Sequence, residues 1–143
     1  MRKINMVVIH CSDSSIGDAD LIRKWHLDKG FSDIGYHYII LNGCPNHKDA
    51  YDPALDGIVQ IGRPEEQIGA HAIGVNKNSI GICLIGEKTF TLFQGMALTK
   101  LLKDLMIRYN LPILRVIGHY EVCKTGKTCP NIDMCLLRDL LDG

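Results

Sequence analysis

The chain of 143 residues carries 16 Lys and Arg against 16 Asp and Glu, so its formal net charge is zero. This length fits one domain with a sizeable core, and a neutral chain has no overall positive field to attract nucleic acid or an anionic membrane. No run approaches the ~20 apolar residues of a membrane span, so we expect partners to be bound at a local site, with neither nucleic acid nor a membrane among them.

The first part of the chain predicts a strand, a helix and a hairpin. Residues 4–9 form a continuous apolar run rich in β-branched side chains, which is typical of a strand buried on both faces. An aspartate can cap the helix that follows, which ends near Lys29, just before a glycine. Residues 35–41 predict a second strand, which pairs with residues 57–61 as a hairpin. Its connection, residues 42–56, is long for a hairpin loop and indicates an insertion or a functional wall.

The second part predicts further buried strands and two helices. Residues 69–79 are punctuated by Gly and Asn and indicate an ordered loop, and residues 80–85 form another apolar strand. Apolar residues recur at helical spacing through residues 92–109, opposite a charged face. Residues 114–117 predict a strand, and Asp133 can cap a last helix.

This order of elements predicts the fold class. A strand, a helix, a hairpin and then alternating strands and helices indicate a single α/β domain with a central mixed sheet. We expect about five to six strands, flanked by about three helices.

The cellular setting is predicted from the N-terminus and the six cysteines. The chain begins with basic residues, but the apolar run after them is short and ends at His10, so we expect no export signal. A chain of this size does not need disulfides, so we expect reduced thiols.

Several side chains capable of chemistry follow the predicted strands. His10 and His119 each come after an aliphatic strand run, and if the two strands are parallel neighbours both imidazoles lie at one edge of the sheet. Cys129 can loop back to the same place, and two His with one Cys form a zinc site that keeps an open position for water. Zinc lowers the pKa of that water from ~15.7 toward ~7. Lys127 and Tyr36 could then donate to the oxyanion of a tetrahedral intermediate.

Spacing alone leaves other interpretations open. A lone His at a strand end is more often structural, and no compact zinc motif occurs in the chain. Cys123 and Cys135 lie close to Cys129 in sequence, so another ligand choice or a disulfide is also consistent with the pattern. We expect Cys83 to be a core residue and His26 to be structural.

A series of short motifs extends from about Met6 to Asp133. In order, they are Val8-Ile-His-Cys-Ser, Trp25-His26, Gly35-Tyr-His-Tyr-Ile-Ile, Gly62-Arg63, Gly69-Ala-His-Ala-Ile-Gly, Asn76 through Gly86, Gly118-His-Tyr-Glu-Val and Cys129-Pro130. The series resembles the type 2 N-acetylmuramoyl-L-alanine amidases, which include phage endolysins and share a fold with peptidoglycan recognition proteins.

The resemblance implies a zinc enzyme. His10, His119 and Cys129 match the zinc ligands of the family, Tyr36 matches its catalytic tyrosine, and Lys127 matches its catalytic lysine. The reaction implied is hydrolysis of the amide between the lactyl group of N-acetylmuramic acid and L-alanine of peptidoglycan.

The same resemblance implies a substrate groove and a setting. His71 matches a histidine that lines the groove, and Arg63 and Asn76 match residues near it. We expect residues 1–143 to form one zinc amidase domain, a monomer that binds muropeptide. Without an export signal, such an enzyme fits a phage or prophage endolysin that stays cytoplasmic until host lysis and then acts on the cell wall.

Two features depart from the family pattern. The interval from His119 to Cys129 is longer than the family leads us to expect, so Lys124 competes with Lys127 for the role of the catalytic lysine. Residues 42–56 also form a longer segment than usual, which would reshape one wall of the groove.

Two other functions stay open. One is a binding module of the recognition-protein kind that holds muropeptide without cutting it, although such members typically lose the cysteine ligand that is present here as Cys129. The other is a cysteine hydrolase that uses Cys11 or Cys129 with a histidine base.

Overall fold

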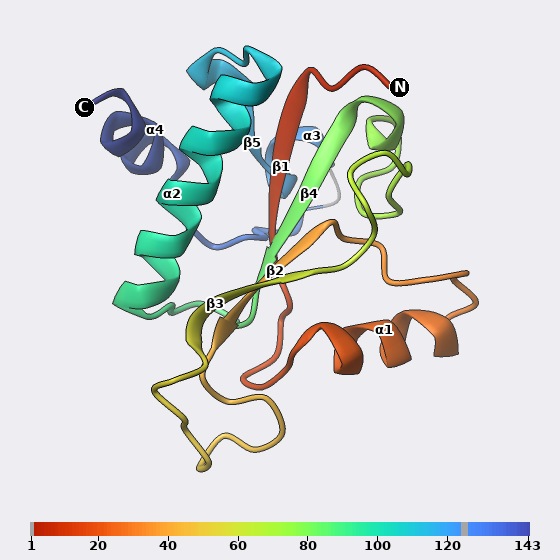
Figure 1. Ribbon diagram of the computed structural model, residues 1–143, viewed down its shortest axis with the longest axis vertical. Helices are drawn as coiled ribbons and strands as arrows, with labels where there is room; N and C mark the ends of the chain where they lie inside the picture. The colour runs from red at the N-terminus through yellow and green to blue at the C-terminus, as the bar shows by residue number, and fades with distance from the viewer. Residues whose placement is uncertain (1, 124–125) are drawn as a thin grey trace.

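In the computed structural model of the chain, residues 2–123 and 126–143 are described, and they form one mixed sheet covered by helices (Figure 1). The strands are β1 (Met6–Cys11), β2 (Tyr38–Asn42), β3 (Asp56–Ile61), β4 (Ser79–Leu84) and β5 (Val116–Gly118). The α-helices are α1 (Ala19–Asp28), α2 (Leu92–Tyr109), α3 (His119–Val122) and α4 (Met134–Asp142), with short 3-10 turns at Asn76–Asn78 and Ile113–Arg115.

The five strands lie in the order β3-β2-β4-β1-β5. β1 runs parallel to both β4 and β5, and β2 runs parallel to β4. Only β3 is antiparallel, because it returns from β2 as a hairpin. The predicted α/β class, mixed sheet and hairpin are therefore confirmed.

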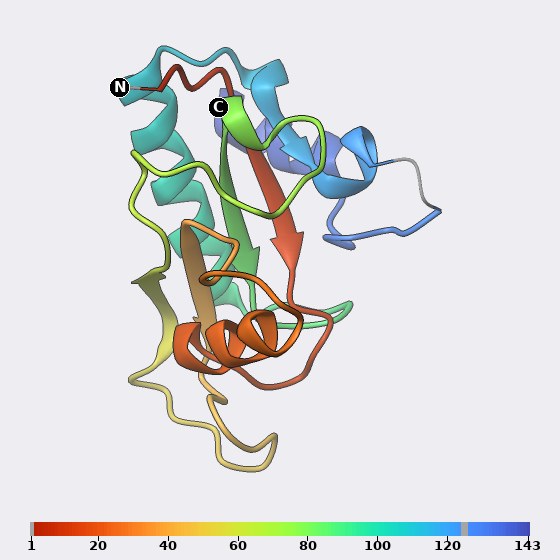
Figure 2. The same ribbon diagram turned by 90° about the vertical axis from the view of Figure 1, so that its right-hand side faces the viewer.

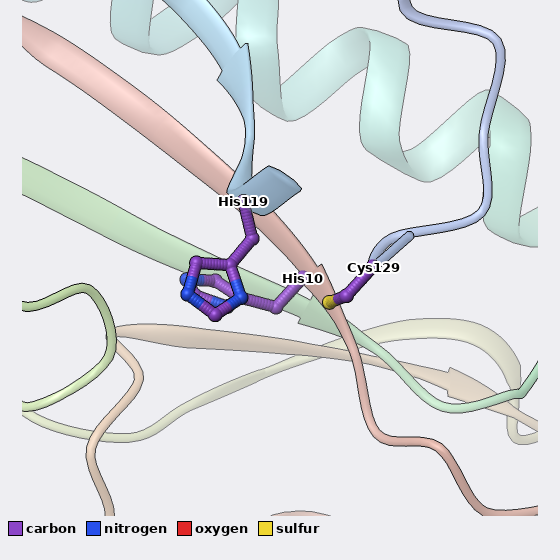
Figure 3. Close-up of side chains that lie close together, drawn as sticks. All are labelled: His10, His119 and Cys129. Carbon is purple, nitrogen blue, oxygen red and sulfur yellow. The ribbon is translucent and has the colours of Figure 1, made fainter. Parts of the chain in front are cut away.

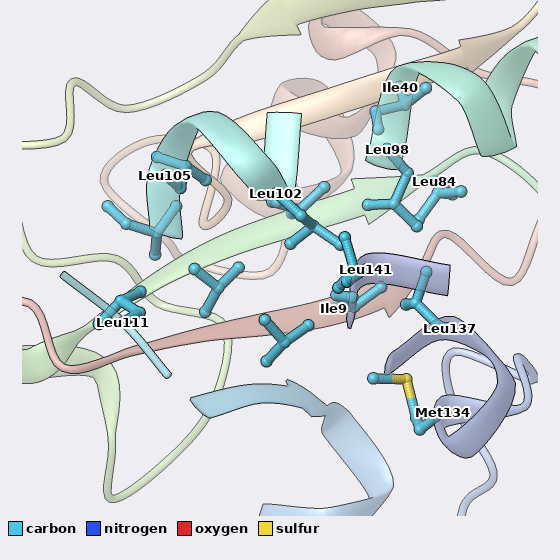
Figure 4. Packing of buried hydrophobic residues seen from close by; sticks show 14 of the residues in the cluster. Ile9, Ile40, Leu84, Leu98, Leu102, Leu105, Leu111, Met134, Leu137 and Leu141 are labelled. Carbon is cyan, nitrogen blue, oxygen red and sulfur yellow. The ribbon is translucent and has the colours of Figure 1, made fainter. Parts of the chain in front are cut away.

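Helices cover both faces of the sheet, as Figures 1 and 2 show. One face packs on α2 and α4, where Ile9 of β1 and Leu84 of β4 meet leucines such as Leu102 and Leu137 (Figure 4). The opposite face packs partly on α1, through Ile22. Cys83 lies fully buried on this second face, which confirms its predicted place in the core.

Side-chain caps fix where the helices begin. The Asp18 carboxylate accepts from the N–H of Leu21 at 2.8 Å, and Asp133 caps α4 in the same way. Thr91 and Gln94 form a capping box at the start of α2, which has the predicted bounds. Among the described residues, no helix has the length and apolar composition that crossing a membrane requires.

The structure departs from the predicted elements in two places next to the site. β2 begins at Tyr38 and not at Gly35, because Gly35 packs so closely on the loop that an added Cβ would lie 2.2 Å from the Ala70 carbonyl oxygen. The chain turns into α3 directly after β5, where the sequence pattern predicted no helix.

Candidate active site

The sheet register brings His10 and His119 together. In the parallel pair β1 and β5, Ile9 lies opposite Gly118, and a histidine follows each of them: His10 within β1 and His119 at the start of α3. His10 lies on the same face of β1 as Val8 and is 1% exposed, and the two imidazole centroids are 4.4 Å apart. This confirms that the two strands are parallel neighbours and that their histidines meet at one edge.

Cys129 joins the two histidines from the segment between α3 and α4 (Figure 3). The N–H of Cys11 donates to Cys129 Sγ at 3.2 Å, and the N–H of Tyr120 donates to the Cys129 carbonyl oxygen at 2.8 Å. One donor atom each from His10, His119 and Cys129 lies within 4.8 Å of the other two. Within residues 2–123 and 126–143, this is the one group of His, Cys, Asp and Glu side chains that could hold a metal ion.

The donor set fits zinc. Two imidazoles and one thiolate are three of the four ligands of a catalytic zinc site, which leaves one position open. Burial, followed by the neighbouring histidines, lowers the pKa of His10 well below its usual value. Burial and then the charge of Lys127 lower the pKa of His119. Both imidazoles are therefore neutral near pH 7, as metal ligation requires.

Among the described residues, no disulfide bond joins any of the cysteines. The structure therefore shows no disulfide among Cys123, Cys129 and Cys135, and the reduced state of the protein stays a prediction.

Tyr36 and Lys127 both line the cleft that holds the two histidines. The Tyr36 ring centroid is 5.0 Å from that of His10. Burial, followed by the nearby thiols, raises the pKa of Tyr36 well above its usual value, so its hydroxyl stays protonated and can donate. Lys124, the competing lysine, lies outside the described residues.

The three residues predicted for the groove lie at different places. His71 lines the cleft, and its Nδ1 is 2.9 Å from His10 Nε2. Asn76 Oδ1 accepts from the N–H of His71 at 2.9 Å and so shapes the loop that carries His71. Arg63 donates to the carbonyl oxygens of Ile34 and Ile68, both at 2.7 Å. Substrate contacts by these three side chains stay predictions.

The cleft has a volume of about 820 Å³, and one of its walls consists of residues to which the sequence pattern gave no role in a site. α1 and the turn after it contribute Trp25, His26, Lys29 and Phe31. His26 has a structural contact, as predicted, because its Nδ1 accepts from the N–H of Gly35 at 2.8 Å, yet its ring also lines the cleft. In the sequence, this wall is indicated by Trp25 and Phe31, the aromatic residues on either side of the end of α1.

Comparison with known proteins places this geometry in a family. The sequence model of the N-acetylmuramoyl-L-alanine amidase family matches residues 1–132. The chain belongs to this family.

Relatives and solved structures agree with this family membership. The endolysin of Escherichia phage T7 is 36% identical over 140 residues, covering 90% of this chain and 81% of the phage protein. The amidase LysC from Clostridium intestinale superposes with a TM-score of 0.82 at 28% identity, over 99% of this chain and 87% of LysC. The ectodomain complex of peptidoglycan recognition proteins LCa and LCx was solved with bound tracheal cytotoxin. It superposes with a TM-score of 0.71 at 25% identity, over 92% of this chain and 80% of the matched chain.

Proposed function

We propose that this amidase is zinc-dependent and hydrolyses the amide between the lactyl group of N-acetylmuramic acid and L-alanine in peptidoglycan. The observation that carries the proposal is the meeting of His10, His119 and Cys129 within 4.8 Å, in a cleft that also holds Tyr36. Family membership supports amide hydrolysis, and the donor set supports zinc.

The residues around the three ligands have separate tasks in this proposal. A zinc ion held by His10, His119 and Cys129 would polarise the scissile carbonyl and lower the pKa of a water molecule. The protonated hydroxyl of Tyr36 donates a hydrogen bond to the oxygen that gains negative charge. The Lys127 ammonium lines the same cleft and adds a positive charge beside that oxygen.

The cleft and the comparisons support muropeptide as the substrate. Aromatic residues and Lys29 line one wall, which suits a ligand with both sugar and peptide parts. The related T7 protein is an endolysin, and the LCa and LCx complex holds tracheal cytotoxin. We therefore propose that residues 1–143 act as one monomeric zinc amidase domain on the cell wall, at host lysis.

Digestion of purified peptidoglycan tests this function. Mass spectrometry should find free stem peptides that begin with L-alanine, together with uncut glycan strands. Removing the metal with a chelator should abolish the release, and adding zinc back should restore it. A cysteine hydrolase would stay active without metal, and a binding module would release nothing even when it is folded and zinc-loaded.

Two cysteine variants complete the experiment. Cys129→Ser should lose activity and bind zinc more weakly, because a thiolate ligand is replaced by a poorer one. Cys135→Ser changes an exposed cysteine and should behave like the wild type. Full lytic activity of Cys129→Ser would contradict the proposed ligand set.

A further inference from the structure

His71 stands between the proposed ligand His10 and the buried hydroxyl of Ser79. Its Nδ1 is 2.9 Å from His10 Nε2, and its Nε2 is 3.2 Å from Ser79 Oγ. We infer that His71 is a positioning residue, which holds His10 in the one tautomer that presents Nδ1 to the metal. This inference rests on the proposed zinc function and deepens it.

Counting protons along these contacts gives one consistent arrangement. A neutral imidazole has one N–H, and the nitrogen that binds a metal carries no proton. Because His10 Nε2 is taken by His71, the ligand atom is Nδ1 and the proton sits on Nε2. That N–H donates to His71 Nδ1, so the single proton of His71 lies on Nε2 and donates to Ser79 Oγ. Each ring nitrogen of the two histidines then has one partner. Ligation of the metal through His10 Nε2 would break the hydrogen bond between His10 and His71.

The His71 ring is fixed by glycines on two sides. A Cβ added at Gly81 would lie 2.6 Å from His71 Cγ, and one added at Gly69 would lie 2.7 Å from His71 Cδ2. The ring therefore fills space that only a glycine leaves open at each position. It also meets the His10 ring edge-on, at an interplanar angle of 87°. His71 cannot turn away without moving β4 or its own loop.

Ser79, at the far end of the contacts, is fixed as well. It is fully buried at the start of β4, and its carbonyl oxygen accepts from Arg2 Nη1 at 3.0 Å. Outer partners of metal-bound histidines orient the ring and select its tautomer. The hydrogen bonds that join Ser79 to His71 and His71 to His10 would act in this way, and all three partners are side chains of the protein.

Zinc affinity, measured by competition with a chromogenic chelator, tests the inference without using activity. His71→Leu removes the acceptor and should weaken zinc binding about 10- to 100-fold. His71→Asn places Oδ1 near the position of Nδ1 and should recover most of that loss. His47→Leu changes an exposed loop histidine and is the matched control, with unchanged affinity expected. Equal zinc affinity of wild type and His71→Leu would overturn the positioning role.

Nitrogen-15 NMR of the histidine rings reads the tautomers directly. We expect a protonated Nε2 on both His10 and His71, with or without zinc, and a zinc-dependent shift at His10 Nδ1. Protonation of His10 at Nδ1, or of His71 at Nδ1, would overturn the inference. Ser79→Ala is a milder variant that should weaken zinc binding less than His71→Leu, in case the latter unfolds.

The outcomes separate this inference from the proposed function. If the wild type cuts peptidoglycan with zinc but His71→Leu binds zinc equally well, the positioning role is wrong and the zinc amidase stands. If the wild type binds no zinc, the proposed function is wrong. The tautomers of His10 and His71 in the metal-free protein then still show whether the hydrogen bonds among His10, His71 and Ser79 are as inferred.

Discussion

At the scale of single residues, the Tyr36 hydroxyl is the donor on which the proposed reaction depends most. It shares the cleft with His10, and burial keeps its pKa raised, so the proton stays in place through the neutral range. Tyr36→Phe removes the hydroxyl and should lower kcat about 10²- to 10³-fold, as the loss of an oxyanion donor does. Zinc content should stay at the wild-type value, which metal analysis checks alongside rates on soluble muropeptide.

The matched control for this variant is Tyr51→Phe, a half-exposed tyrosine in the loop before β3 that does not line the cleft. Its kcat should equal that of the wild type. A Tyr36→Phe enzyme with an unchanged kcat would remove Tyr36 from the mechanism.

Two lysines compete for one role, and substitution decides between them. Lys127 lines the cleft, where burial and then the charge of Lys127 lower the pKa of His119. Lys127→Ala should therefore reduce kcat about 10²-fold through loss of charge stabilisation. Lys124→Ala should retain full kcat, as measured in the same muropeptide assay. The reverse pattern would assign the catalytic role to Lys124.

The sequence pattern predicted some of these residues better than others. His10 and His119 could be found because each follows an apolar strand run, and the family resemblance favoured Cys129 over the neighbouring Cys123 and Cys135. The contacts of His71 with His10 and of Cys11 with Cys129 join residues far apart in the chain, so spacing could not reveal them. Likewise, Asn76 and Arg63 bond to loop backbone in the structure, which a motif match could not distinguish from binding substrate.

At the scale of elements, one carboxylate ties the loop after β3 to β2 and to the end of α2. Glu65 accepts hydrogen bonds from Arg108, Tyr109 and Tyr38. Burial by itself would raise the pKa of Glu65, but these three donors outweigh it and lower that pKa to about 2. The ionised carboxylate therefore stabilises the folded state.

The pH dependence of stability tests this contact. Because the pKa of about 2 in the folded protein lies below the ordinary glutamate value of 4.5, the stabilisation is present above pH 4.5 and is lost as the pH falls toward 2. Glu65→Gln should lower the free energy of unfolding by about 2 kcal/mol at pH 7, after allowing for solvent screening at the half-exposed Arg108. Denaturant titrations at several pH values measure it.

The control for Glu65→Gln is Glu66→Gln, which changes an exposed neighbour with the same chemistry. It should unfold like the wild type at every pH. If Glu65→Gln lowered the free energy of unfolding by the same amount from pH 7 to pH 2.5, ionisation of Glu65 would not be the source of the stabilisation.

Elements with a clear apolar period could be predicted well, and those set by packing could not. α2 has the predicted bounds because its apolar stripe and capping box both lie within the helix. β2 starts late because the Gly35 backbone packs on Ala70, and α3 forms where the chain leaves β5. Neither event leaves a hydrophobic pattern in the sequence.

At the scale of the whole molecule, the site exists because distant strands become parallel neighbours. β1 lies between β4 and β5, so one sheet edge collects residues from the first and last thirds of the chain. Composition and periodicity indicated an α/β domain but not the order β3-β2-β4-β1-β5, since strand order depends on long-range pairing. The ordered motifs indicated, through the family they resemble, only that His10, His119 and Cys129 meet in one site.

X-ray absorption at the zinc edge of the zinc-loaded protein tests the central claim most directly. The account predicts one zinc per chain, with two nitrogen ligands at ~2.0–2.1 Å, one sulfur at ~2.3 Å and one further light atom. The sulfur contribution should disappear in Cys129→Ser and persist in Cys11→Ser. A protein that binds no zinc, or a site with two sulfur ligands, would contradict the account.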